Sequence, residues 1–186
     1  MNAADLEDLA LWLIAPEQDC PDWLDIWAAA YPTAYQTLLG APENRQEQLQ
    51  AAFDGMPSEN ASNNCLPVKN IAVVAFGAGV PAFAEWLYRA DIQTRKSVRN
   101  IILVTPPPAG FSDGLYTHEA LHASCPCRAA LVIGTGNSEG YRQTAARLAA
   151  GWKARLLTAP DFGRLNAVSG GWEWGMKLMQ EMLLSD

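Results

Sequence analysis

Short apolar segments alternate with helix-like segments along most of this chain. Six runs have the length and composition of buried strands: residues 9–14, 35–39, 71–75, 101–105, 129–133 and 154–157. Helical patterns occupy residues 21–30, 44–53, 80–90, 140–151 and 170–184. Such alternation is typical of right-handed βαβ units. We therefore expect an α/β fold, a three-layer α/β/α sandwich with a mostly parallel sheet of about six strands. Ligands of such sheets bind at the carboxyl ends of the strands.

Size and charge restrict the kinds of partner. A chain of 186 residues with 49% hydrophobic residues can bury one substantial core, so a single domain over residues 1–186 is expected. The net charge of −7, with 13 scattered basic residues, argues against nucleic acid and against an anionic membrane. The apolar runs are too short to span a bilayer. An acidic amino terminus and only four cysteines favour a cytoplasmic protein with reduced thiols.

Residues 71–80 have the layout of a nucleophile elbow, in which a strand enters a sharp turn and then a helix. In the motif G-x-S-x-G, a serine occupies the turn and small residues stand two positions before and after it. Here Ala75 and Gly79 are the small residues, and Gly77 stands in place of the serine. Glycine adopts a positive φ at little cost. The sequence therefore predicts the turn without its nucleophile, followed by the backbone N–H of Ala78 as one oxyanion donor.

Four further segments resemble a known family. They are Pro21-Asp22-Trp23 with Trp27, the run I-L-V-T-P-P at 102–107, the helix end at 145–154, and G-R-L-N-A-V-S-G at 163–170. With the elbow, these segments make the chain similar to small serine hydrolases of the retinoblastoma-binding-protein-nine and YdeN type. The resemblance implies an α/β-hydrolase-like fold without a large cap.

The same resemblance implies that the catalytic serine, aspartate and histidine correspond to Gly77, Asn137 and Arg164. Gly77 has no side chain to attack a carbonyl. Asn137 lacks the charge that stabilises an imidazolium, and Arg164 stays protonated and cannot act as a base. The loop at 15–22, which includes Glu17, is shorter than its counterpart in the family, which leaves the second oxyanion donor in question. We expect a catalytically inactive member, a pseudoenzyme with a degenerate triad.

Such a protein could keep a pocket at the former active site for a ligand or a protein partner. Its expected residues are Gly77, Ala78, Asn137 and Arg164. A helix amino terminus and a guanidinium together favour a small anion. The alternative is that Arg164 pairs internally with Asn137 or with an acidic neighbour such as Glu17 or Asp161.

Two other functions stay open from the sequence. An active, esterase-like hydrolase could use Ser138 or Ser169, although the resemblance places no base near either. A zinc protein could use His118, His122, Cys125 and Cys127, since residues 118–122 match H-E-x-x-H with Glu119 as the base. That segment is short for a zinc-protease helix, so we expect no metal and solvated histidines.

No cofactor is expected either. The Gly134-Thr135-Gly136 turn has Glu139 where a dinucleotide loop has its third glycine, and an acidic ribose partner is missing.

Overall fold

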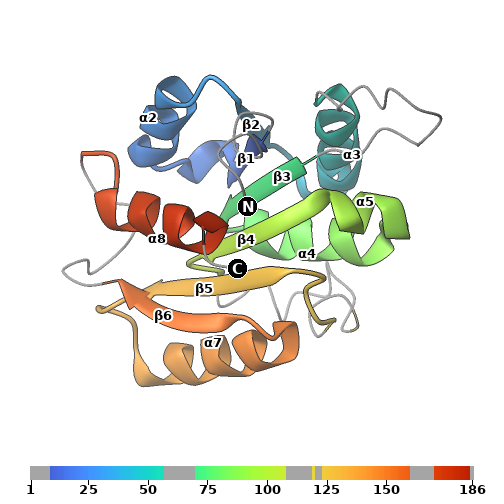
Figure 1. Ribbon diagram of the computed structural model, residues 1–186. Coiled ribbons are helices and arrows are strands. Elements are labelled where there is room, and N and C mark those ends of the chain that lie inside the picture. Colours follow the sequence, from blue (N-terminus) through green and yellow to red (C-terminus); the bar gives the residue numbers. More distant parts are fainter. Residues whose placement is uncertain (1–8, 57–69, 108–118, 120–122, 160–169, 185–186) are drawn as a thin grey trace.

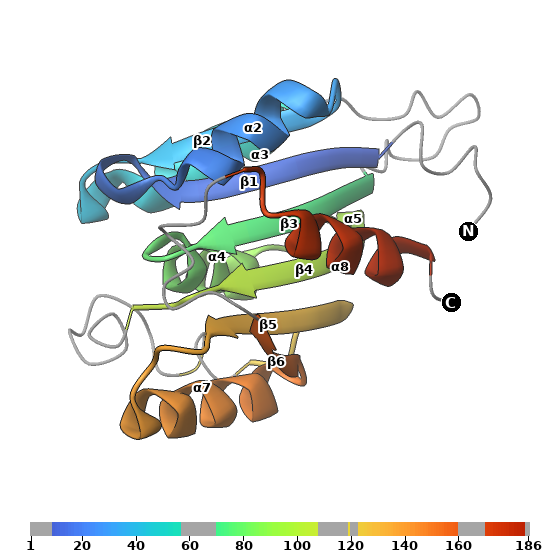
Figure 2. The same ribbon diagram turned by 90° about the vertical axis from the view of Figure 1, so that its left-hand side faces the viewer.

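One parallel sheet organises the molecule. The computed structural model describes residues 9–56, 70–107, 119, 123–159 and 170–184. In this part of the chain, six strands pair in the order β2-β1-β3-β4-β5-β6, and every pairing is parallel. The strands lie side by side and point the same way in Figure 2. Their bounds are Leu9–Pro16 (β1), Ala34–Leu39 (β2), Asn70–Phe76 (β3), Val98–Val104 (β4), Arg128–Gly134 (β5) and Arg155–Ala159 (β6).

Helices cover both faces of the sheet, which gives the three-layer α/β/α arrangement predicted from the sequence. One face carries α2 (Asp22–Ala30) and α8 (Glu173–Leu184). The opposite face carries α3 (Arg45–Gly55), α4 (Gly79–Arg89) and α7 (Glu139–Trp152). Figure 1 shows α2 and α8 on one side of the strands and α3 and α4 on the other. The shorter elements are α5 (Ile92–Ser97), η1 (Glu17–Asp19) and η2 (Pro42–Asn44).

Burial on both faces explains why the central strands are nearly continuous apolar runs. Along β3, Ile71, Val73 and Ala75 pack toward α3, α4 and α7. The alternate residues Ala72, Val74 and Phe76 pack toward α2 and α8. Each of these side chains is at most 2% exposed. The edge strand β6 differs, because most of its residues are partly or fully exposed.

Tryptophans divide between the two faces. Trp12 of β1 contacts Phe83 and Trp86 of α4 edge-on, with ring centroids 6.0 and 5.1 Å apart. On the other face, Trp23 lies 4.6 Å from Trp172, just before α8, and Trp27 Nε1 donates a 2.6 Å hydrogen bond to the Gly171 carbonyl. These contacts fix the first and last helices against each other and against the sheet.

Glycines allow close packing at two places. A Cβ at Gly79 would lie 3.0 Å from the Ile14 carbonyl oxygen, so α4 approaches β1 closely at its first turn. A Cβ at Gly175 would lie 2.2 Å from Cε3 of Trp172, so the indole ring occupies the space over α8.

Residues 91–100 differ from the sequence expectation. The chain forms the short helix α5 there, and β4 begins at Val98 rather than at residue 101. Asp91 caps α5 by accepting hydrogen bonds from Gln93 N (2.7 Å) and Thr94 N (2.9 Å). The pairing of β4 with β3 then skips Arg99, which forms a bulge. Across the described segments, no helix combines the length and apolar character needed to cross a bilayer.

Candidate functional site

The turn between β3 and α4 has the geometry of a nucleophile elbow. Gly77 has φ +56°, the left-handed conformation that its sequence context predicts. Its N–H donates to the Val104 carbonyl at 3.0 Å, and its own carbonyl accepts from Val80 N at 3.1 Å. Ala78 holds the N-cap position, and α4 starts at Gly79. No nucleophilic side chain stands at this turn; in the first turn of α4, Val80 N–H is already used by the Gly77 carbonyl and Pro81 has no N–H.

Pro16 is the neighbour of the turn. A Cβ built on Gly77 would lie 3.7 Å from both Cδ and Cγ of Pro16, and no other described residue beyond its chain neighbours comes within 4 Å. That distance is ordinary van der Waals contact, so the position has room for a small side chain. Pro16 ends β1 and has no N–H to donate. The β1 residue nearest the turn therefore cannot be the second donor of an oxyanion hole.

The carboxyl ends of β3, β4 and β5 are joined by further backbone hydrogen bonds. Thr105 N donates to the Val132 carbonyl at 2.9 Å, next to the bond between Gly77 and Val104. Thr105 has φ +45°, a strained conformation for a β-branched residue, and its buried Oγ1 has no hydrogen-bond partner among the described residues. No pattern in the sequence marks this conformation, because a left-handed backbone at a threonine leaves no signal there.

Asn137 lies at the same edge, in the turn between β5 and α7. Its Nδ2 donates to the Gly134 carbonyl at 2.9 Å, and its side chain is partly exposed. The next residue, Ser138, caps α7 by accepting from Tyr141 N at 3.3 Å. Because β4 lies between β3 and β5, the structure brings Gly77 and Asn137 to one edge of the sheet, two strands apart. Asn137 is held as an amide donor to its own loop.

Tyr141 ties α7 to the chain after β4. Its hydroxyl donates to the Pro106 carbonyl at 2.7 Å, and burial raises its pKa above the ordinary value. A protonated, hydrogen-bonded phenol of this kind is a structural donor and is unsuited to the role of a base.

Several residues predicted for a site lie outside the described residues. These are Arg164 of the degenerate triad, its possible partner Asp161, the candidate nucleophile Ser169, and the histidines His118 and His122. Glu17 is described and is exposed in η1, where Oε2 lies 3.9 Å from the position of a Cβ on Gly40. The described part of the proposed pocket is thus Gly77, Ala78 and Asn137.

The two cysteines of the possible zinc site are described and carry free thiols. Burial raises the pKa of Cys125 and of Cys127 to about 12. For Cys127 the nearby Cys125 adds to this rise, and Arg99 opposes it. Cys125 N also donates to the Trp152 carbonyl at 3.0 Å. Within the described ranges, no group of three or more His, Cys, Asp or Glu side chains could hold a metal ion.

Comparison with known proteins assigns this chain to a family. A sequence model of the family described as "Serine hydrolase" matches residues 18–181. The chain belongs to the serine hydrolase family. A solved structure from Pectobacterium atrosepticum, described as a YdeN-like hydrolase, shares the fold with a TM-score of 0.70 and 13% identity. The alignment covers 96% of this chain and 92% of that one. A search of curated proteins finds no match.

Membership of the serine hydrolase family confirms the resemblance drawn from the sequence segments. In this member the β3–α4 turn has the left-handed backbone and the close approach of α4 to β1, with glycine at its centre.

Proposed function

We propose that this chain is a catalytically inactive member of the serine hydrolase family, which retains a binding pocket at the degenerate site. The observation that carries the proposal is Gly77 at φ +56° in the elbow turn, where a nucleophile would stand. Without an attacking oxygen at this position no acyl-enzyme can form there. A site limited to oxyanion donors and binding accelerates hydrolysis by only ~10³–10⁴-fold over water.

Two neighbours support the same conclusion. Pro16 contributes no N–H opposite the turn, so it cannot supply the second oxyanion donor beside the Ala78 N–H. Asn137 uses its amide to donate to Gly134, which is the opposite role from a carboxylate accepting an imidazole N–H. Arg164, which the resemblance aligns with the catalytic histidine, adds no base.

Labelling with a fluorophosphonate probe tests the proposal directly. We expect no covalent adduct on the folded protein, and no turnover on a panel of short-chain and aromatic esters. A serine hydrolase with an intact triad, treated in the same reaction, is the positive control. Stoichiometric labelling of a serine, together with ester turnover that is lost when that serine is replaced by alanine, would contradict the proposal and favour an active hydrolase.

Ser138 is the described candidate for such a rival nucleophile. Its Oγ already accepts the capping bond from Tyr141 N. A Ser138→Ala variant is therefore the matched control for the labelling experiment. It is expected to behave like the parent.

A restoration variant tests which groups are missing. Gly77→Ser, Asn137→Asp and Arg164→His together would supply the three side chains of the triad. We expect at most weak esterase activity, because Pro16 still lacks an N–H. Adding Pro16→Gly to the triple variant restores an N–H at that position. A further rise in kcat with the fourth substitution would identify the donor as the limiting defect.

The retained pocket is proposed for a small anionic ligand or for a protein partner. The hypothesis that the pocket binds an anion rests on the amino terminus of α4 and on Arg164. Titration with phosphate, sulfate and acetate, read by amide NMR at Gly77 and Ala78, is expected to shift these signals in the parent and less in Arg164→Gln. Equal shifts in both proteins, or none in the parent, would leave a protein partner as the better proposal.

A cytoplasmic location is also proposed. The three described cysteines, Cys20, Cys125 and Cys127, are free thiols, as expected in a reducing compartment. Fractionation of the source cells would test it.

A further inference from the structure

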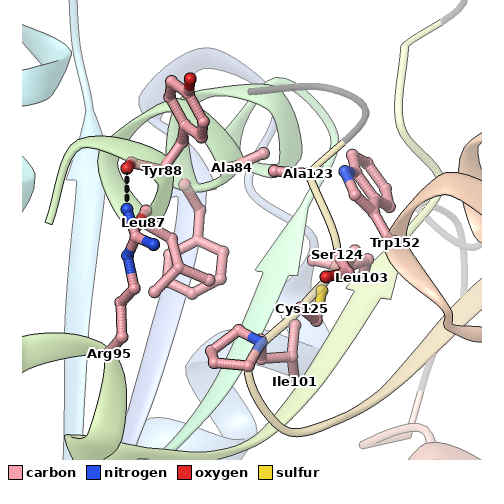
Figure 3. Close-up of a pocket in the computed structure, with 12 residues that line it drawn as sticks. Ala84, Leu87, Tyr88, Arg95, Ile101, Leu103, Ala123, Ser124, Cys125 and Trp152 are labelled. Atoms are coloured by element: carbon pink, nitrogen blue, oxygen red, sulfur yellow. Dashed lines mark hydrogen bonds between the residues drawn. The ribbon is translucent and has the colours of Figure 1, made fainter. Parts of the chain in front are cut away.

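A cavity lies on the sheet face covered by α4 and α7, beside β4 and the chain that leads into β5. Its volume is about 270 Å³. The floor is apolar and buried, formed by Phe83, Leu87, Ile101, Leu103 and Trp152. Tyr88, Arg95 and the chain from Ala123 to Pro126 form the rim. Figure 3 shows these side chains around the hollow, with Arg95 at one side.

A wider groove of about 820 Å³ adjoins this cavity and shares Arg95 and Pro126 with it. Lys96 and Arg99 also line the groove. Among the described residues, neither the cavity nor the groove is lined by an Asp or Glu, although the chain has 20 acidic and 13 basic residues. An apolar hollow therefore opens beside a basic surface on an otherwise acidic protein.

The basic side chains are placed by different local structures. Arg95 is fixed against the end of α4, since Nε donates to the Leu87 carbonyl at 3.1 Å and Nη2 donates to the Tyr88 carbonyl. Arg99 is the bulge residue at the start of β4, is exposed, and donates from Nε to Asn70 Oδ1 at 2.9 Å. Lys96 is exposed in the last turn of α5. Bulges redirect a side chain out of the regular pleat.

We propose that this cavity and groove form a second binding site, for an amphiphilic anion that joins a short apolar chain to a carboxylate. The apolar part would replace water over Leu103 and Trp152, where the buried floor gains from contact with hydrocarbon. The carboxylate would lie in the groove near Lys96 and Arg99, where charge is complementary. The size of the cavity limits the chain to a small ligand, at the low end of usual ligand pockets.

This site is separate from the elbow. Helix α4 starts beside Gly77 at the carboxyl edge of the sheet, whereas Leu87 and Tyr88, near its other end, border the cavity together with the chain before β5. The proposal does not depend on whether the elbow is catalytic.

Three probes separate the two parts of the proposed ligand. Octanoate has both the chain and the anion, octylammonium has the chain with the opposite charge, and acetate has the anion without the chain. We expect octanoate to bind at least about tenfold more tightly than either of the others, by calorimetric titration. In amide NMR, octanoate should shift Leu103, Cys125 and Trp152, whereas acetate should leave these three signals unchanged even where it shifts Gly77 and Ala78 at the elbow.

Two variants test the assignment on the protein itself. Lys96→Gln with Arg99→Gln removes two exposed charges, and we expect octanoate binding to weaken about fivefold. Arg147→Gln with Lys177→Gln removes two exposed charges elsewhere and should leave binding unchanged. Ala84→Phe fills the rim of the cavity and should abolish binding, whereas Ala146→Phe, on the exposed face of α7, should not.

Several results would overturn the proposal. Equal affinity for octanoate and octylammonium would show that the basic groove does not bind the carboxylate. Unchanged binding in the Lys96 and Arg99 double variant would do the same. Octanoate-induced amide shifts confined to Gly77 and Ala78 would show that octanoate binds at the elbow instead. The absence of any amide shift in the parent protein would show that octanoate does not bind in the cavity.

Discussion

At the residue scale, Gly77 permits a backbone that other residues adopt at a cost. Gly77→Ser places a side chain on φ +56°, and we expect the free energy of unfolding to fall by about 1–3 kcal/mol. The loss would come from the backbone, because the nearest atoms of Pro16 stand 3.7 Å from the new Cβ. Urea unfolding followed by far-ultraviolet circular dichroism measures it.

Gly140→Ser is the matched control. Gly140 is in the first turn of α7, its φ is not positive, and a Cβ there meets no atom within 4 Å. Serine at this helical position should be neutral or stabilising by roughly 0.5 kcal/mol. Equal losses at positions 77 and 140 would show that the strained turn is not the cause.

At the scale of one element, α4 is held against β1 by the absence of a side chain at Gly79. A Cβ would meet the Ile14 carbonyl oxygen at 3.0 Å, and this oxygen belongs to a strand that cannot easily move. We expect Gly79→Ala to lower the free energy of unfolding by about 1–3 kcal/mol. Gly55→Ala, at the end of α3 with no atom within 4 Å, should cost nothing measurable. A Gly79→Ala protein as stable as the parent would mean that α4 can shift away from β1.

Helix α5 gives a prediction about pH. Backbone hydrogen bonds from Thr94 and Gln93 lower the pKa of Asp91. A lowered pKa means that the cap stabilises the folded state above the ordinary carboxyl pKa, and that this contribution is lost as pH falls through the folded pKa. Asp91→Ala should therefore destabilise near about pH 6, and the difference from the parent should shrink toward about pH 2.5.

Asp91→Asn is the control for that experiment. Asparagine caps helices well but does not titrate. Its stability should stay close to that of the parent near neutral pH, and should lack the part of the acid dependence that belongs to residue 91. Urea midpoints across the pH series provide the measurement. A difference between parent and Asp91→Ala that stays constant down to acid pH would contradict the capping role.

At the scale of the whole molecule, stability should be graded across the sheet. The central strands β3 and β4 are buried on both faces, whereas β6 at one edge is largely exposed. We expect amide hydrogen exchange in β3 and β4 to require global unfolding, and exchange in β6 to proceed through smaller openings. Exchange rates measured against denaturant concentration would separate these two classes. Exchange in β6 as slow as in β3 would contradict this gradient.

The burial of the strands also explains how much of the fold can be predicted from the sequence. All six strands were expected near their observed bounds, and for β1, β3, β4 and β5 the reason is that a strand buried on both faces is a continuous apolar run. Helix α5 was missed, since six mostly polar residues capped by Asp91 give no hydrophobic period. Family membership followed from local motifs. The turn at Gly77 was predicted because its pattern spans ten consecutive residues.

Features that depend on distant residues could not be predicted in this way. Pro16 reaches Gly77 only because β1 pairs with β3. The apolar cavity combines α4, α5, β4, the chain before β5 and the end of α7, five parts of the chain with no common motif. The backbone strain of Thr105 follows from its position between two strand ends. Each of these features exists only after the sheet has formed.

The contact between Pro16 and Gly77 also bears on the history of the chain. If the degenerate site is inactive, a reversion that restores serine at position 77 would strain the turn and would still face a proline without a donor. Such a revertant loses stability and gains no turnover that selection could favour. Recovery of hydrolysis therefore requires several substitutions to arise together. Single substitutions toward the triad would be selected against, so the loss of activity is hard to reverse by stepwise evolution.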